Sequence, residues 1–498
     1  MKLNLVLPRF AATRLTILCL LFTGCVGCAF GATNKAPVAR VSPDSLAFGA
    51  ETVGKTTAAK YVTIRNVGNA DLSFSSDMGI TGKFDFAGAG TCTASTPVAP
   101  GESCTVSVKF TPTAAGWQAG VLSVKDNAGS QIVELEGTGV ATSSGSASGS
   151  SGSSGSGSGS GSTTTSVSCS VYVSPTGSDS NPGTLDAPWR TVNTAFADMK
   201  SGDTLCLRGG TYPNTVSSGY SQTFENLSGT PSKPLIVTNY PGEVAIIGGS
   251  TRIQAAYVTF LSTPNTSSGL IFQGPTPSGM DLIDVMYSHD VTLNHVEIRD
   301  GSYHAGIYQY DGYNIKLLGS YIHDNGRPGQ INTDNGIYWD ATTGSGNLIA
   351  NCVVEHNVAQ GIQLYPAPTN VVVEENTIVN NGNWVALYGS NNVFVNNIMS
   401  GNGTASGNPQ VDIEGTGYTI NSNLTWSTQS SQLGVLNDSS QSVTKLINAN
   451  PLFVNPSAHN YQLESGSPAI GAGNSSYTQP IDRNGTKRPS PPAIGAYQ

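Results

Sequence analysis

The sequence predicts an all-β protein of two domains, a β-sandwich followed by a β-solenoid. Three features carry this prediction: near-repeats between residues 289 and 403, short alternating apolar runs between residues 37 and 141, and a Ser/Gly segment between the two regions. Repeats of about 20 to 50 residues indicate a solenoid, a propeller or an array. Because these repeats consist of short β-type runs without a helical period, a β-solenoid fits best.

Composition limits the classes of function. Only 11% of the 498 residues are charged and 59 are glycine, which is low in charge for a helical cytosolic protein and ordinary for a secreted β-rich one. The net charge of −9, with 23 Lys and Arg residues, excludes a strongly basic surface for nucleic acid. We expect a monomer whose membrane contact, if any, is a lipid anchor.

Residues 1–32 have the organisation of an export signal, with basic residues before the apolar run Leu15–Phe22. The segment from Phe22 to Cys25 resembles a bacterial lipobox, with Phe in place of the usual Leu, and predicts lipidation at Cys25 or Cys28. The alternative is plain cleavage near residues 29–32. Either outcome predicts a secreted or cell-surface bacterial protein, and lipidation would make it an outer-membrane lipoprotein.

Residues 37–141 contain alternating runs separated by turn residues, at the spacing of a β-sandwich. Cys92 and Cys104 lie close in sequence, and an exported compartment permits a disulfide between them. Four stretches resemble the immunoglobulin-like domains of the Hydin, or choice-of-anchor D, type. They are Pro43–Gly49, Val62–Gly68, Gly101–Pro112 and Leu135–Gly139. The resemblance implies a spacer or adhesion module without catalytic residues.

Residues 142–167 are almost entirely Ser, Gly and Thr. Such a composition cannot bury a core, so the sequence predicts a flexible linker.

The second domain is predicted over residues 168–498. An amphipathic helix is expected over 190–199, with Val192, Ala195, Phe196 and Met199 on one face, where it would cover the open end of the solenoid. Residues 203–212 follow as the first coil strand. Cys169 and Cys206 flank this start and can also pair, whereas Cys352 is left as a buried thiol.

The repeats predict which side chains face inward. Each repeat has a last apolar residue before a polar corner: Ile298, Ile322, Val354, Ile378 and Met399. A second ladder predicts Ile307, Ile337, Ile362 and Ala386 inside, with two short strands per coil and Trp339 in the core. Period-two alternation then makes two outward columns, Tyr308/Tyr338/Gln363 and Tyr310/Asp340/Tyr365. Asn at the corners suits a left-handed backbone and a side-chain ladder between coils.

Both ends of the second domain carry a resemblance. The stretches Tyr172–Gly183, Pro188–Val192 and Gly202–Tyr212 are similar to the entry of secreted right-handed parallel β-helix proteins of the pectate-lyase-like superfamily. Residues 447–498 resemble a choice-of-anchor Q tail, through 450–454, 466–473 and 493–497. The resemblance implies the fold but no single activity, because the superfamily includes lyases, hydrolases, epimerases and non-catalytic members. Its lyases commonly use a Lys or Arg base with Ca²⁺ on acidic residues.

Five of the six histidines fall between residues 289 and 356. Stacked repeats place Arg299, His323 and Glu355 in one column and Asp300, Asp324 and His356 in the next, about 4.8 Å apart along the stack. β-Elimination of a uronic acid needs a base and a cation, and hydrolysis needs paired carboxylates. The candidate catalytic residues are Arg299, His323, Asp324, Asp340, Glu355 and His356. The candidate sugar-binding residues are His304, Tyr308, Tyr310, Tyr338 and Tyr365, and the candidate Ca²⁺ ligands are Asp300, Asp324 and Asp334.

Each candidate also has a purely structural interpretation. Corner Asp and His residues commonly satisfy turns, Asp300, Asp324 and Asn325 extend an Asn ladder equally well, and outward Tyr residues pack on sheets. The leading hypothesis is a polysaccharide lyase that cleaves uronic-acid-containing glycans. A non-catalytic carbohydrate-binding or adhesion protein and a glycoside hydrolase are the alternatives. Converging acids and a base would favour an enzyme, and mutually satisfied side chains would favour a binding protein.

Overall fold

The computed structural model describes residues 36–498 except 43–44, 76–77, 81, 89, 114–115, 141–167, 263–268, 341–343, 404–406, 408, 430–433 and 438–439. The predicted export signal, with Cys25, and the predicted linker 142–167 lie outside the described residues. Within the described part of the chain, no helix combines the length and the apolar character needed to cross a membrane.

The first domain consists of two four-stranded sheets, as the alternating runs predict. Phe48, Phe84 and Phe110 meet in its core, with the rings of Phe84 and Phe110 4.8 Å apart. Cys92 and Cys104 form a disulfide. One sheet has the order β1 (Ala39–Ser42), β3 (Lys60–Asn66), β6 (Ser103–Phe110), β5 (Phe84–Phe86), and the other β2 (Ser45–Thr52), β8 (Gly129–Val140), β7 (Gly116–Asp126), β4 (Gly79–Ile80).

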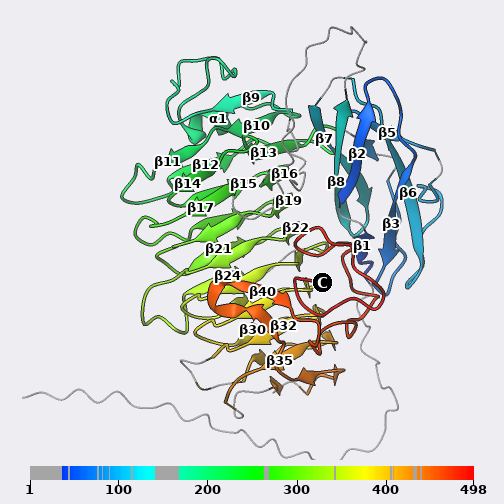
Figure 1. Ribbon diagram of the computed structural model, residues 1–498, viewed down its shortest axis with the longest axis vertical. Helices are drawn as coiled ribbons and strands as arrows, with labels where there is room; N and C mark the ends of the chain where they lie inside the picture. The colour runs from blue at the N-terminus through cyan, green and yellow to red at the C-terminus, as the bar shows by residue number, and fades with distance from the viewer. Residues whose placement is uncertain are drawn as a thin grey trace, which may run out of the picture. The chain divides into compact units, whose positions relative to one another are not determined.

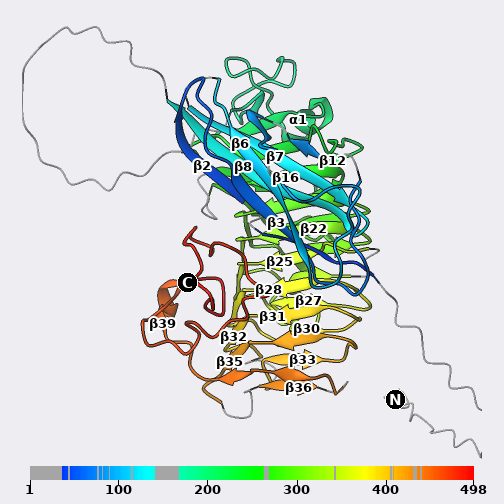
Figure 2. The ribbon, with the colours of Figure 1, turned by 90° about the vertical axis from the view of Figure 1, so that its right-hand side faces the viewer.

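The second domain is a parallel β-helix with three sheets. Figures 1 and 2 show its coils stacked from β9 at one end to β36 near the other. We call the sheets first, second and third, in the order in which one coil of the chain visits them.

The first sheet contains β9 (Val171–Val173), β10 (Thr204–Leu207), β13 (Leu235–Asn239), β16 (Ala256–Leu261), β19 (His289–Asn294), β22 (Tyr313–Leu318), β25 (Leu348–Ala350), β28 (Val372–Glu374), β31 (Val393–Val395), β34 (Thr419–Asn421) and β37 (Val443–Thr444). The second contains β11 (Gly210–Tyr212), β14 (Ala245–Gly248), β17 (Leu270–Gln273), β20 (Glu297–Arg299), β23 (Tyr321–His323), β26 (Val353–Glu355), β29 (Thr377–Val379), β32 (Ile398–Ser400), β35 (Leu424–Trp426) and β38 (Ile447–Asn448). The third contains β12 (Gln222–Glu225), β15 (Thr251–Gln254), β18 (Ile283–Met286), β21 (Ala305–Tyr310), β24 (Asn335–Trp339), β27 (Ile362–Leu364), β30 (Val385–Leu387), β33 (Val411–Ile413) and β36 (Val435–Asn437).

The expectation of two strands per coil is wrong, because each coil has three. The missed corner lies between a strand of the first sheet and the next strand, which belongs to the second sheet. One residue there has a left-handed backbone, for example His295 at φ 52°, Asn351 at 56° and Asn396 at 60°. In the sequence the two strands look like one continuous apolar run. A single left-handed residue turns the chain without interrupting the inward apolar pattern. The hydrophobic alternation therefore does not reveal this corner.

The predicted inward ladder of the second sheet is confirmed by its register. Ile298 pairs with Ile322, Ile322 with Val354, Val354 with Ile378 and Ile378 with Met399. All five side chains lie in the main core. Trp339 is fully buried there as predicted, and Cys352 is a buried free thiol.

In the third sheet the predicted place of Ala386 is wrong. Ile307 pairs with Ile337 and Ile337 with Ile362, but Ala386 pairs with Gln363. Val385 takes the inward position and joins the core. The corner before β30 is one residue shorter than the corner before β27, since Val385 follows Ile378 by seven residues and Ile362 follows Val354 by eight. A shift of one residue exchanges the two faces of a strand.

Ladders of Asn side chains join successive coils at the corners. Asn357 illustrates one rung: its Oδ1 accepts the backbone N–H of Asn325 at 3.1 Å, and its Nδ2 donates to Oδ1 of Asn381 at 2.9 Å. Asn381 is joined to Asn402 in the same way. These buried amides satisfy backbone donors that the turns leave outside the sheets.

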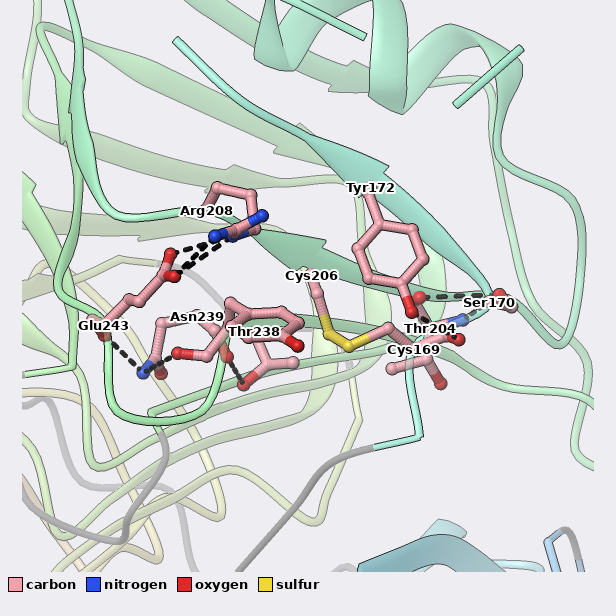
Figure 3. Close-up of a disulfide and its surroundings, with 10 residues drawn as sticks. Cys169, Ser170, Tyr172, Thr204, Cys206, Arg208, Thr238, Asn239 and Glu243 are labelled. Atoms are coloured by element: carbon pink, nitrogen blue, oxygen red, sulfur yellow. Dashed lines mark hydrogen bonds and ion pairs between the residues drawn. A yellow bond between two sulfur atoms is a disulfide. The ribbon is translucent and has the colours of Figure 1, made fainter. Parts of the chain in front are cut away.

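The predicted helix closes one end of the β-helix. Helix α1 (Val192–Asp198) is capped by Thr191, whose side chain accepts the N–H of Thr194, and it buries Val192, Ala195 and Phe196. Cys169 and Cys206 form a disulfide beside this end. Figure 3 shows this disulfide together with Tyr172 and the Arg208–Glu243 ion pair, whose closest N–O distance is 2.8 Å.

The C-terminal segment, residues 453–498, packs on the second sheet. It begins with β39 (Phe453–Asn455), the 3₁₀ helix η2 (Pro456–Ala458) and β40 (Asn460–Leu463). Tyr461, Ala496 and Tyr497 cover Val353 and Val379, and Ala469 and Ile494 cover Ile398 and Leu424. The sheet is therefore covered by a segment that lies far from its strands in the sequence.

Candidate functional site

The structure divides the candidate catalytic residues between two sheets. Arg299, His323 and Glu355 are in register on the second sheet, as predicted. Asp340 instead follows β24 of the third sheet, where its Oδ2 accepts the hydroxyl of Tyr308 at 2.8 Å. The predicted set therefore forms two separate groups and not one site.

The group on the second sheet is centred on His323, which is fully paired. Its Nδ1 lies 2.7 Å from Oδ2 of Asp324 and its Nε2 lies 3.4 Å from Oε1 of Glu297. Burial lowers the pKa of His323, but hydrogen bonds with the two carboxylates outweigh it and raise that pKa to about 9. The same bond to His323 lowers the pKa of Asp324. His323 is therefore a charged member of an ion-pair network near neutral pH.

Glu355 is fully buried beneath the C-terminal segment. Its carboxylate accepts the hydroxyls of Tyr321 and Tyr461 and lies 2.9 Å from Nδ1 of His459 and 3.2 Å from Nδ1 of His356. A carboxylate with four partners and no exposed surface cannot reach a polysaccharide. The sequence could not show this, because two of the partners come from residues 459 and 461.

The third sheet carries a second group, which we call the third-sheet cluster. Its outward column runs from Arg252 to Asp284, Tyr308 and Tyr338 on adjacent strands. Asp281, His304 and Tyr220 complete the cluster. Sequence reasoning found Tyr308, Tyr338 and His304 but missed the other four. Extending the Ile307/Ile337 ladder one coil upstream to Ile283 would have placed Asp284 beside Tyr308.

The pKa of Asp284 in this cluster is strongly raised. Burial, followed by the charge of Asp281, raises its pKa from 3.8 to about 7, although Tyr220, Arg252 and His304 act in the opposite direction. Its Oδ1 has no hydrogen-bond partner among the described residues. A carboxyl that titrates near neutrality and keeps a free oxygen is well suited to acid–base catalysis.

His304 lies at the corner before β21, with Nδ1 3.4 Å from Oδ1 of Asp281. Burial lowers its pKa, but the hydrogen bond and charge of Asp281 and the charges of Asp334 and Asp284 outweigh this, and the pKa is raised. Its ring packs edge-on against Tyr338, with the centroids 4.7 Å apart. The imidazolium form is thus stabilised beside an aromatic side chain, and 30% of the side chain is exposed.

Partly exposed tyrosines continue along the same face. The ring centroids of Tyr308 and Tyr338 are 5.2 Å apart, and those of Tyr338 and Tyr365 6.5 Å. Tyr310 contacts Tyr287 at one end and Tyr365 contacts Tyr388 at the other. This tyrosine row, residues 287, 310, 308, 338, 365 and 388, follows the stacking direction of the coils. The sequence predicted four of its six members.

The predicted Ca²⁺ ligands do not form one ligand set. Asp334 is buried and binds Arg327 through both carboxylate oxygens at 2.7 Å, Asp324 pairs with His323, and Asp300 accepts from Gln273. Ca²⁺ requires about six to eight oxygen ligands around one point. Among the described residues, the group of three metal-ligating side chains that the structure brings together is Glu355, His356 and His459, which contains two nitrogen donors. Asp300, Asp324 and Asp334 therefore do not converge on one Ca²⁺ ion as the sequence predicts.

Comparison with known proteins agrees with both domains. The model of the Pel9A-like right-handed β-helix region matches residues 171–463. The ASH model (abnormal spindle-like microcephaly-associated, ASPM-SPD-2-Hydin) matches residues 37–132. These matches agree with the resemblances noted for the sandwich and for the β-helix.

Curated relatives include pectate lyases. Pectate lyase PEL9 of Emericella nidulans is 29% identical over 222 residues, which is 42% of this chain and 52% of that protein. Pectate lyase L of Paenibacillus polymyxa is 26% identical over 222 residues, which is 42% of this chain and 48% of that protein. The chain therefore spans about half the length of these relatives.

Among solved structures, pectate lyase Pel9A aligns with 66% of this chain and 96% of its own, at 17% identity and a TM-score of 0.47. The family model covers more than half of the 498 residues and nearly all of the β-helix. The chain therefore belongs to the Pel9A-like right-handed β-helix family.

Proposed function

We propose that this protein is an exported polysaccharide lyase that cleaves uronic-acid-containing glycans by β-elimination in the third-sheet cluster. The observation that carries the proposal is Asp284, a buried carboxyl with a pKa of about 7 between two cationic side chains, Arg252 and His304. Membership of the Pel9A-like family and the pectate lyase relatives support a lyase.

The residues of the cluster supply each requirement of β-elimination. Arg252, whose guanidinium lies 5.3 Å from the ring centre of Tyr220, binds the uronate carboxylate and neutralises it. The Tyr220 hydroxyl, which interacts with Asp284, takes the C5 proton as it donates its own proton to the ionised Asp284 carboxylate. The C4–O4 bond breaks as the C4–C5 double bond forms, and the His304 imidazolium protonates the leaving O4. No metal ion enters this scheme, because among the described residues the three predicted Ca²⁺ ligands are paired separately and do not converge.

The tyrosine row binds the sugars on either side of the cleaved bond. The rings of Tyr308, Tyr338 and Tyr365 lie 5.2 and 6.5 Å apart, and tyrosine faces combine an apolar surface with a hydroxyl. The row also favours a second candidate function, that of a non-catalytic carbohydrate-binding protein. The tyrosine surface could bind sugars even if Asp284 had no part in catalysis.

Absorbance at about 235 nm tests the proposal, with the full chain acting on a panel of uronate polysaccharides in chelator and in added Ca²⁺. An unsaturated product absorbs there, and we expect the signal in chelator as well. Asp284→Asn should lower kcat/KM by about 100-fold or more, whereas Asp198→Asn, an exposed residue of α1, should leave it unchanged.

The other outcomes separate the alternatives. New reducing ends without absorbance would identify a hydrolase and overturn the lyase proposal. Neither signal, with retention on a polysaccharide column that weakens in Tyr338→Ala, would identify a binding protein. Full activity in Asp284→Asn would place the active site elsewhere.

A further inference from the structure

We propose that Glu355, His356 and His459 bind a divalent transition-metal ion, with Zn²⁺ as the best match, and that this ion fastens the C-terminal segment to the β-helix. Glu355 ends β26 of the second sheet and His356 follows it, and His459 directly follows η2. The three side chains thus join two parts of the chain that are about a hundred residues apart. This site is separate from the third-sheet cluster and independent of the proposed lyase activity.

The ligand atoms already have the spacing of a metal site. The three atoms lie within 4.8 Å of one another. Nδ1 of His459 is 2.9 Å from Glu355 Oε1, and Nδ1 of His356 is 3.2 Å from Glu355 Oε2. Ligands about 2.0 to 2.1 Å from a tetrahedral Zn²⁺ are about 3.3 Å from each other. Each histidine nitrogen is therefore about as far from the Glu355 carboxylate as two ligands of one Zn²⁺ ion are from each other.

Neighbouring side chains orient the ligands. Tyr321 and Tyr461 donate their hydroxyls to the Glu355 carboxylate from either side, which fixes its direction. Asp324 adds a negative charge close by, since the charges of His356 and His459 contribute to its lowered pKa. Two negative charges beside two imidazoles attract a divalent cation.

The donor types select the metal. Imidazole nitrogens with one or two carboxylates suit Zn²⁺, Co²⁺ or Ni²⁺, whereas Ca²⁺ requires oxygen ligands throughout. The His356 side chain is 39% exposed and that of His459 52%, so an ion can enter from solvent while buried Glu355 anchors it.

Co²⁺ binding to the chelator-treated full chain tests the site, because tetrahedral Co²⁺ has visible absorption bands that no protein group shares. We expect saturation at one equivalent and displacement by Zn²⁺. His459→Asn and His356→Asn should each weaken Co²⁺ binding at least tenfold. His289→Asn, a change at another partly exposed histidine next to an acid, is the matched control and should bind like the parent chain.

A second measurement tests the fastening. Hydrogen exchange of residues 453–463 should slow when Zn²⁺ is added to the parent chain and to His289→Asn, but not in His459→Asn. Absence of Co²⁺ bands, or equal Co²⁺ affinity in His459→Asn and His289→Asn, would overturn the proposal. Because neither readout involves cleavage of a glycan, failure here would leave the proposed lyase untouched, and the reverse also holds.

Discussion

Asp284 shows how burial and a neighbouring carboxylate can bring the pKa of a carboxyl group to about 7. It is 3% exposed, lies near Asp281 and retains one oxygen without a hydrogen bond. Both burial and the adjacent carboxylate disfavour its ionised form. The same arrangement that prepares the group for proton transfer therefore destabilises the fold when the group ionises.

This electrostatic cost predicts a pH dependence of stability. The Asp284 pKa is about 7 in the fold and about 4 in the unfolded chain, so between these values the folded state binds more protons. Stability should fall as pH rises from about 4 to 7. Asp284→Asn should remove roughly 1 to 3 kcal/mol of this fall, measured by urea unfolding at several pH values. Asp198→Asn serves as the control, and an unchanged pH slope in Asp284→Asn would contradict the assigned pKa.

At the scale of elements, the corners hold the coils in register. Each Asn rung pairs with backbone of its own coil and with the next rung, as Asn357 does with Glu355 O at 3.0 Å and Asn381 Oδ1 at 2.9 Å. The amide replaces hydrogen bonds that the strands cannot make where the chain turns. The register of the coils along the stack thus depends on buried polar side chains.

Removing one rung should therefore be costly. Asn357→Ala leaves the buried backbone N–H of Asn325 without its acceptor, and we expect a loss of about 2 to 4 kcal/mol in the free energy of unfolding. Asn484→Ala, an exposed residue of the C-terminal segment, should change stability by less than about 0.5 kcal/mol. Chemical denaturation of the two variants checks this, and similar values for both would show that the ladder contributes little.

At the scale of the whole molecule, the C-terminal segment completes the second sheet. It covers Val353, Val379, Ile398 and Leu424. It also supplies Arg488, Thr478 and the N–H of Gln479 to Glu375, which is itself fully buried. Without the segment, apolar surface and buried carboxylates on this face would meet water.

A chain that ends at residue 452 should accordingly be less stable. We expect a Tm lower by several degrees and increased binding of a dye that detects exposed apolar surface. Val454→Ser, at a position 47% exposed within the same segment, should match the full chain. A truncated chain with the original Tm and no dye binding would show that the segment is not part of the cooperative unit.

Much of the fold and part of the site followed from the sequence. The ladder from Ile298 to Met399 and the outward position of Tyr308 and Tyr338 were predicted from repeat spacing and period-two alternation. The capping helix was predicted from its apolar face, and the disulfide pairs from the positions of the cysteines. These features depend on residues close together in the sequence or on a pattern that recurs in every coil, so they can be predicted without the tertiary structure. Ala386 failed because one corner of irregular length exchanged the faces of β30.

The sequence by itself determined the repeat, the inward side chains and the membership of a β-helix family. Only the tertiary structure decided which outward side chains meet. Left-handed corner residues send Glu355 and Asp340 to different sheets, and the C-terminal segment brings His459 and Tyr461 onto Glu355 from a hundred residues away. The physical reason is that alternation fixes the face of a strand on which a side chain lies. Which residues lie beside that side chain depends on the corners and on long-range packing, and neither produces a periodic pattern in the sequence.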